Sequence, residues 1–107
     1  MDKYEATPDY RSEDERIESL VYKLRIVDEL SAVMREKFRE KEPLRRRDWR
    51  EKPMPLDLVL GWILEEVVEL TRAAPEDAFR EAADVANLAG IYADIKRRAA
   101  LVDEVRG

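Results

Sequence analysis

The sequence contains no cysteine and no histidine among its 107 residues. The absence of cysteine excludes a disulfide framework, a thiolate nucleophile and a cysteine metal site. The absence of histidine removes the commonest general base, every Ser-His triad and the Glu-x-x-His ligand pairs of di-iron bundles. Any metal bound by this chain must therefore be a hard cation held by oxygen atoms, so we expect magnesium or manganese before zinc or iron.

The sequence also lacks long apolar runs and has almost no side-chain amides. Its N-terminal stretch, MDKYEATPDYRSEDER, is charged, and no segment approaches the roughly 18 apolar residues of a membrane span. We therefore expect a cytoplasmic protein with no membrane partner. Glutamine is absent and Asn87 is the single asparagine, a bias typical of proteins that avoid thermolabile amides.

Charge is abundant but unevenly placed along the chain. Charged residues make up 42% of the sequence, well above the usual value of about 25%, which favours an ion-paired surface. Residues 1–54 hold 14 Lys or Arg and 14 Asp or Glu, whereas residues 55–107 hold 6 and 11, so the second half carries the whole net charge of -5. An acidic half is a poor nucleic-acid surface and a reasonable cation site, so we expect no nucleic-acid partner.

The apolar residues recur with a helical period and without strand-like alternation, which predicts an all-α fold in a single domain, residues 1–107. Ser12 and Glu15 match the capping-box pattern, so a long first helix should begin at Ser12 and end before Pro43. The connector that follows, residues 43–55, holds three prolines and a basic run. One stripe of the first helix has helical spacing and comprises Ile17, Leu20, Val21, Leu24, Val27, Ser31, Met34 and Phe38.

Two further helices should form an antiparallel hairpin. The second is expected from residue 55 or 57 to about residue 72, and Pro75 suits the first position of the third. The third should continue to about Arg98, after which residues 99–107 either extend it or form a short fourth helix. Because the turn between the second and third helices is short, these helices should lie antiparallel to each other.

The second helix carries three carboxylates although most of its surface is apolar. At about 100° per residue, Glu65, Glu66 and Glu69 fall within an arc of about 100°, while apolar residues cover most of the rest. A helix that is apolar on most sides is expected to be buried. In the third helix, Glu81 and Asp84 project within the apolar stripe, where an unpaired ion would cost several kcal/mol. This stripe comprises Val85, Leu88, Ile91, Tyr92 and Ile95.

Hairpin geometry predicts that these carboxylates meet. Counted from the turn near Ala74, Glu69 and Glu81 lie level to within roughly 3 Å along the helix axes, and so do Glu66 and Asp84. Such a cluster repels itself unless a divalent cation bridges it or the carboxyl pKa values rise. A solvated acidic arc paired with arginines is the plainer alternative, but the position of two acids within an apolar stripe favours a metal site.

The two acidic motifs resemble those of a known family. E-E-x-x-E at Glu65, Glu66 and Glu69, followed by E-x-x-D at Glu81 and Asp84, resembles the MazG-like all-alpha nucleoside triphosphate pyrophosphohydrolases. The resemblance is concentrated in the stretches GWILEEVVELTRA and EAADVANLAGIYADI. It implies a helical bundle completed by oligomerisation, as a homodimer or homotetramer. It also implies hydrolysis of a nucleoside or deoxynucleoside triphosphate between the alpha and beta phosphates, giving a monophosphate and pyrophosphate.

The resemblance further implies roles for individual residues. Glu66, Glu69, Glu81 and Asp84 would be the ligands of Mg²⁺, or of Mn²⁺. Glu66 would also take part in catalysis with Glu65, which would assist a second metal or orient the attacking water. One departure from the family is that only eleven residues separate Glu69 from Glu81, which leaves little room for base recognition and leaves the substrate's identity open.

Other side chains are candidates for binding the substrate, each with a plainer alternative. Asn87 could hydrogen-bond a ligand or be a satisfied structural amide. Trp62 could stack on a base or belong to the core. Cationic partners for the triphosphate are expected in the basic runs Lys96 to Arg98 or Arg45 to Arg47. Asp94 is interpreted as a solvated or helix-pairing residue in preference to a ligand.

Three functions are compatible with the sequence. A magnesium-dependent nucleotide pyrophosphohydrolase is favoured over a helical interaction or regulatory module without turnover. Phosphoribosyl-ATP pyrophosphohydrolase, from the same superfamily, is a third reading that no phosphate-binding signature selects. Trp49 could cover a nucleotide or anchor an interface, while Gly61 and Gly90 are interpreted as sites of close helix packing.

Overall fold

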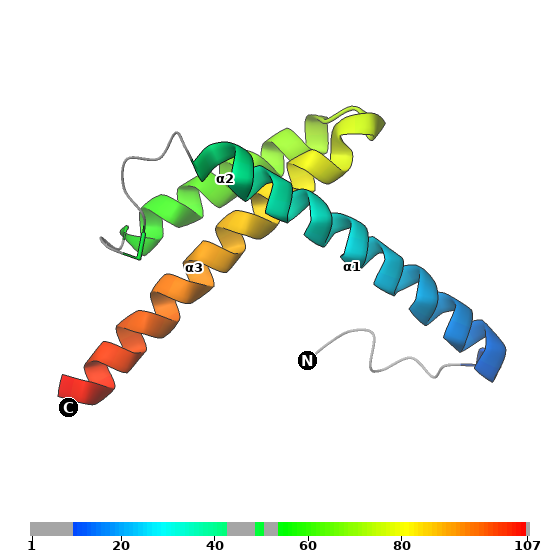
Figure 1. The fold of residues 1–107 in the computed structure, drawn as a ribbon, viewed down its shortest axis with the longest axis horizontal. Coiled ribbons are helices and arrows are strands. Elements are labelled where there is room, and N and C mark those ends of the chain that lie inside the picture. Colours follow the sequence, from blue (N-terminus) through cyan, green and yellow to red (C-terminus); the bar gives the residue numbers. More distant parts are fainter. Residues whose placement is uncertain (1–9, 43–48, 51–53, 107) are drawn as a thin grey trace.

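The computed structural model describes residues 10–42, 49–50 and 54–106, and all regular structure within these ranges is helical (Figure 1). Along the chain these elements are α1 (Glu13–Lys41), α2 (Leu56–Arg72), the 3₁₀ turn η2 (Pro75–Asp77) and α3 (Ala78–Arg106). The predicted all-α class is confirmed for this part of the chain. Within the same ranges, no helix combines the length and the apolar character needed to cross a membrane.

α1 begins where the capping pattern predicts. Ser12 Oγ accepts a hydrogen bond from the backbone N–H of Glu15 at 3.2 Å and donates one to the Glu15 carboxylate at 3.0 Å. This contact satisfies one of the N–H groups that the first turn of a helix leaves without a partner. At the other end, the N–H of Glu42 donates to the carbonyl of Phe38. The helix therefore ends before Pro43, as expected.

α2 and α3 form the predicted antiparallel hairpin (Figure 1). α2 begins after Pro55, whose carbonyl accepts two hydrogen bonds from the first turn, and it ends at Arg72. Pro75 then opens η2, a single 3₁₀ turn that leads directly into α3. α3 continues unbroken to Arg106, so the residues after Arg98 extend this helix and do not form a fourth one.

The core lies where α1 and α2 pack against α3. Among the described residues, the buried apolar side chains are Val59, Ala83, Ile91 and Ile95. The stripe of α3 that the sequence singled out therefore faces its neighbours. The partly buried side chains that surround the core are Phe38, Trp49, Met54, Leu56, Ile63, Leu88 and Tyr92.

The helices do not close into a compact bundle. The N-terminal half of α1 projects away from the hairpin, and the C-terminal part of α3 projects in another direction (Figure 1). The radius of gyration is 17.9 Å, whereas a compact chain of this length has a radius of about 13 Å. As a result, part of the α1 stripe is exposed, namely Ile17, Leu20, Val21, Leu24 and Val27.

α2 is also less buried than its apolar surface predicts. Val59 is its one buried residue, so the expectation of a buried helix is wrong for the single chain, which covers one side of α2. The interpretation of Gly61 and Gly90 as close-packing sites is also wrong for the single chain, because a Cβ at either position would meet nothing within 4 Å among the described residues. The exposed apolar residues of α2 are Leu58, Leu60, Leu64, Val67 and Val68.

Candidate functional site

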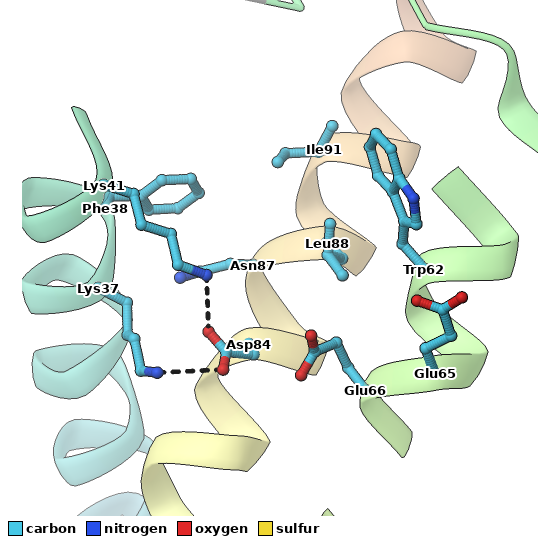
Figure 2. Close-up of a pocket in the computed structure, with 10 residues that line it drawn as sticks. All are labelled: Lys37, Phe38, Lys41, Trp62, Glu65, Glu66, Asp84, Asn87, Leu88 and Ile91. Atoms are coloured by element: carbon cyan, nitrogen blue, oxygen red, sulfur yellow. Dashed lines mark hydrogen bonds and ion pairs between the residues drawn. The ribbon is translucent and has the colours of Figure 1, made fainter. Parts of the chain in front are cut away.

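Three of the five singled-out carboxylates meet between α2 and α3. Glu66, Glu81 and Asp84 each present a carboxylate oxygen, and these oxygens lie within 4.8 Å of one another. Glu81 and Asp84 share one face of α3 because they are three residues apart. Glu66 comes from α2, and Figure 2 shows its carboxylate directed toward Asp84. We call these three residues the carboxylate group.

Glu65 and Glu69 lie outside the carboxylate group. Both side chains are exposed. Glu69 is nevertheless near enough for its charge to act on Glu66. Glu65 lines the same cavity as Glu66, one helical turn after Trp62, which also lines it. The structure thus gathers three of the four expected metal ligands and places Glu65 beside them.

The protonation of Glu66 reflects its surroundings. Partial burial, followed by the negative charges of Asp84, Glu81 and Glu69, raises the pKa of the Glu66 carboxyl above its ordinary value of 4.5, and Lys41 acts in the opposite direction. Burial is the largest of these causes, and the neighbouring carboxylates add the repulsion expected of a cluster without a cation. A divalent cation beside Glu66 would favour its ionised form and reverse the effect.

Two lysines that the sequence did not single out neutralise Asp84 (Figure 2). Lys37 Nζ lies 3.0 Å from Asp84 Oδ2, and Lys41 Nζ lies 3.2 Å from Asp84 Oδ1. The lysines are four residues apart on α1 and so point the same way. Asp84 is 8% exposed as a residue, and the Lys37 side chain is 12% exposed, so this pair is largely removed from water.

A cavity of about 180 Å³ opens beside these charges. We call it the charged cavity. Asp84, Glu66 and the two lysines lie at one end of it in Figure 2, and Trp62 and Ile91 lie at the other. Its lining comes from all three α-helices: Lys37, Phe38, Lys41, Trp62, Glu65, Glu66, Asp84, Asn87, Leu88 and Ile91.

Asn87 is buried at the wall of the charged cavity, with 7% of its surface exposed. Its Nδ2 donates a hydrogen bond to the carbonyl of Met34 at 3.1 Å, which ties α3 to α1. Its Oδ1 is buried and has no hydrogen-bond partner among the described residues. Buried acceptors without a partner are rare and costly. The amide is therefore structural through Nδ2, while Oδ1 is a buried acceptor to which no described residue donates.

A second cavity, of about 400 Å³, adjoins the charged one. The two cavities share Phe38, Asn87 and Ile91 in their linings. We call the second one the aromatic cavity, because the rings of Phe38 and Trp49 lie beside each other there, with centroids 6.2 Å apart. Its complete lining is Met34, Phe38, Glu42, Trp49, Ala86, Asn87, Gly90 and Ile91.

Asp94 holds Trp49 in place. Trp49 Nε1 donates to Asp94 Oδ2 at 3.0 Å, and Arg97 and Arg98 pair with the same carboxylate at 3.0 and 3.2 Å. The indole hydrogen bond is the largest cause that lowers the pKa of Asp94, and the two arginines lower it further. Asp94 is thus a pairing residue, as interpreted from the sequence, and it fixes one wall of the aromatic cavity.

The predicted cationic partners of a triphosphate that belong to the described residues, Lys96 to Arg98, line neither cavity. Lys96 is exposed on α3 and lines neither cavity. Arg97 and Arg98 are engaged by Asp94, and residues 45–47 lie outside the described part of the chain. Among the described residues, the cations that line the cavities are Lys37 and Lys41. The sequence offered one signal for them: Lys37 precedes Phe38, the last residue of the α1 stripe, and Lys41 follows it by three residues.

Comparison with models of known protein families, with curated proteins and with solved structures finds no match to this chain. Carboxylate oxygens are the ligands preferred by Mg²⁺ and Mn²⁺. Two ammonium groups beside them suit an anionic ligand, and an adjoining apolar space suits the uncharged part of such a ligand.

Proposed function

We propose that this protein is a magnesium-dependent nucleoside triphosphate pyrophosphohydrolase, which converts a nucleoside or deoxynucleoside triphosphate to the monophosphate and pyrophosphate. The observation that carries the proposal is the convergence of Glu66, Glu81 and Asp84 to within 4.8 Å at the wall of a cavity. The resemblance of the two acidic motifs to those of the MazG-like pyrophosphohydrolases points to the same reaction. The absence of histidine and cysteine leaves a hard cation as the natural source of catalytic charge.

The carboxylate group would hold Mg²⁺, or Mn²⁺ in its place. Two further observations support a ligand site here: Asp84 is buried, and Asn87, in the same cavity lining, has a buried Oδ1 without a hydrogen-bond partner among the described residues. When bound, the cation would neutralise phosphate charge and make water a better nucleophile near neutral pH. Glu65 lines the cavity outside the group and would accept a proton from the attacking water.

The two adjoining cavities suit a nucleotide in one orientation. The charged cavity, with the carboxylate group and the lysines, would take the polyphosphate. The aromatic cavity would take the nucleoside, with the rings of Phe38 and Trp49 at its wall. Asn87 lines both cavities, and its Oδ1 would accept a hydrogen bond from a donor on the base or the sugar. Trp62 lines the charged cavity, so this orientation assigns base stacking to Trp49 in preference to Trp62.

We also propose that the active form is an oligomer of this chain. The single chain exposes 9007 Å², whereas a compact protein of 12.6 kDa exposes about 6,200 Å². The excess, about 2,800 Å² per chain or about 5,600 Å² for two chains, lies at the upper end of what permanent dimers bury in total, about 2,000–5,000 Å² or more. It is contributed in part by the exposed apolar faces of α1 and α2. A second copy covering these faces would complete the helical bundle.

The test of the proposed reaction is direct. The purified protein is incubated with a panel of ribo- and deoxyribonucleoside triphosphates and Mg²⁺, and pyrophosphate and monophosphate are measured as products. Glu66→Gln should abolish product formation, whereas Glu29→Gln, at an exposed position of α1 on the side away from its apolar stripe, should leave it unchanged. The absence of product across the panel, with a thermal stability that Mg²⁺ does not change, would refute the proposal.

A second candidate is a helical interaction module without turnover. The exposed apolar faces of α1 and α2 favour it, because such faces mark contact surfaces whether or not the protein is an enzyme. A protein of this kind would form its oligomer or complex and release no pyrophosphate. Phosphoribosyl-ATP belongs in the same substrate panel, so that the third reading is tested in the same experiment.

A further inference from the structure

The two ion pairs of Asp84 occupy both of its carboxylate oxygens. Lys37 takes Oδ2 at 3.0 Å and Lys41 takes Oδ1 at 3.2 Å. A cation held by the carboxylate group needs one of these oxygens as a ligand. It would therefore compete with the lysines for Asp84, because a carboxylate oxygen in contact with an ammonium group is screened from a second positive charge.

The local charge also changes sign when a divalent cation enters. The three carboxylates of the group and the two ammonium groups together carry a charge of -1, and a divalent cation brings this total to +1. Lys37 is nearly buried, with 12% of its side chain exposed. Its ammonium group therefore stays out of solvent after a cation binds Asp84. A buried ammonium group without a partner is costly, which favours the arrival of an anion at the same place.

We infer that Lys37 and Lys41 are exchangeable counter-ions of the site. They pair with Asp84 when no cation is bound, and they pair with the phosphate groups of the ligand when a cation is coordinated by Asp84. This inference rests on the proposed function, because it takes the carboxylate group as the cation site. Its consequence is that the cation and the polyphosphate bind cooperatively. Each should bind weakly alone, and each should strengthen the other by the same factor.

Calorimetry on the full chain tests this inference without any assay of activity. Mn²⁺ is the first probe and is titrated alone. Inorganic tripolyphosphate is the second probe and is titrated in excess Mn²⁺, so that no base is needed. Each titration compares the wild type with Lys37→Gln and Lys41→Gln, with the charge-conserving Lys37→Arg, and with Lys23→Gln at an exposed position of α1. Circular dichroism checks that every variant is folded.

The expected changes have opposite signs for the two probes. Lys37→Gln should bind Mn²⁺ alone at least about fivefold more tightly than the wild type, and it should bind the Mn²⁺ complex of tripolyphosphate at least about fivefold more weakly. Lys41→Gln should change both affinities in the same directions. Lys37→Arg should stay close to the wild type for Mn²⁺, and Lys23→Gln should match it for both probes. A residue that merely supported the fold would weaken both titrations together.

The other outcomes refute either the counter-ion exchange alone or the cation site itself. If the wild type binds Mn²⁺, but Lys37→Gln and Lys41→Gln leave the affinity for Mn²⁺ unchanged or weaken it, the counter-ion exchange is wrong and the proposed function stands. The same conclusion follows if both variants bind the tripolyphosphate complex as tightly as the wild type does. If the wild type binds neither Mn²⁺ nor its tripolyphosphate complex, the cation site itself is wrong, and the proposed function falls together with the inference.

Discussion

Asp84→Asn should destabilise the protein even though it removes a charge from a self-repelling cluster. The substitution keeps the shape of the side chain but deprives Lys37 and Lys41 of their common counter-ion. Removing one partner of a buried ion pair costs about 3–5 kcal/mol. Here the cost should be smaller, because an amide oxygen still accepts one hydrogen bond and the Lys41 side chain is 47% exposed. We expect a loss of about 2–3 kcal/mol in the free energy of unfolding.

Glu66→Gln should act in the opposite direction. No ion pair neutralises Glu66 among the described residues, and its raised pKa means that the folded state disfavours the ionised form. Replacing it by an amide removes repulsion from Asp84 and Glu81. The gain should be of the order of 1 kcal/mol, the Coulomb energy of two unit charges about 4 Å apart in water. The two amide substitutions thus remove the same charge from the same group and should shift stability in opposite senses.

Urea unfolding followed by circular dichroism measures both effects, at pH 7, without divalent cations and at one fixed protein concentration. Glu29→Gln is the control and should stay within about 0.5 kcal/mol of the wild type, since Glu29 is exposed on the side of α1 away from its apolar stripe. If Asp84→Asn is as stable as the wild type, the lysines do not depend on Asp84. If Glu66→Gln is destabilised as much as Asp84→Asn, the assignment of repulsion to Glu66 is wrong.

Three further predictions concern titration, the aromatic cavity and the α1 surface. The native state should bind more protons than the unfolded state between pH 4.5, the ordinary pKa of Glu66, and its raised value in the fold, so the free energy of unfolding should fall as pH rises through this window. Glu66→Gln should flatten that slope, and cation affinity should rise with pH across the same window. Gly90→Ala should stabilise α3 by roughly 0.5–1 kcal/mol, because a Cβ there meets nothing. The same change narrows the aromatic cavity, so it should raise the KM for a nucleoside triphosphate and leave tripolyphosphate binding unchanged; equal KM values would place the nucleoside elsewhere. Leu24 is 52% exposed in the single chain, yet Leu24→Lys should convert an oligomer to a monomer, with the mass measured by light scattering. An unchanged mass would place the interface away from α1.

Most of the fold could be predicted from the sequence because its signals are local. The Ser12 cap, the prolines around the connector and the short turn before Pro75 each fix a helix end through backbone chemistry that involves few neighbours. The burial of α2 could not be predicted in this way. An apolar helix surface indicates that something covers it, but the helical period does not say whether the cover is the same chain or another copy.

The site could be predicted in part for a similar reason. The hairpin register places Glu66 level with Asp84, and this follows from residue counts along two helices joined by a short turn. Lys37 and Lys41 could not be found by such counting, since the angle at which α1 crosses α3 depends on packing and not on any motif. The basic runs that looked suitable for phosphate were conspicuous in the sequence, whereas the lysines at the site stand singly among glutamates and arginines.

The balance of buried groups leads to a prediction about stability. Among the described residues, two of the six buried ones are polar, Asp84 and Asn87, and the four apolar ones make a small core. Because a third of these buried residues belong to the site, the chain should be marginally stable without ligands. Any ligand that binds the folded state should increase its free energy of unfolding. Saturation at 100 times Kd adds about 2.7 kcal/mol. Mg²⁺ and tripolyphosphate together should therefore raise the melting temperature by more than the sum of their separate effects. Purely additive shifts would mean that Asp84 and its lysines do not couple the two ligands.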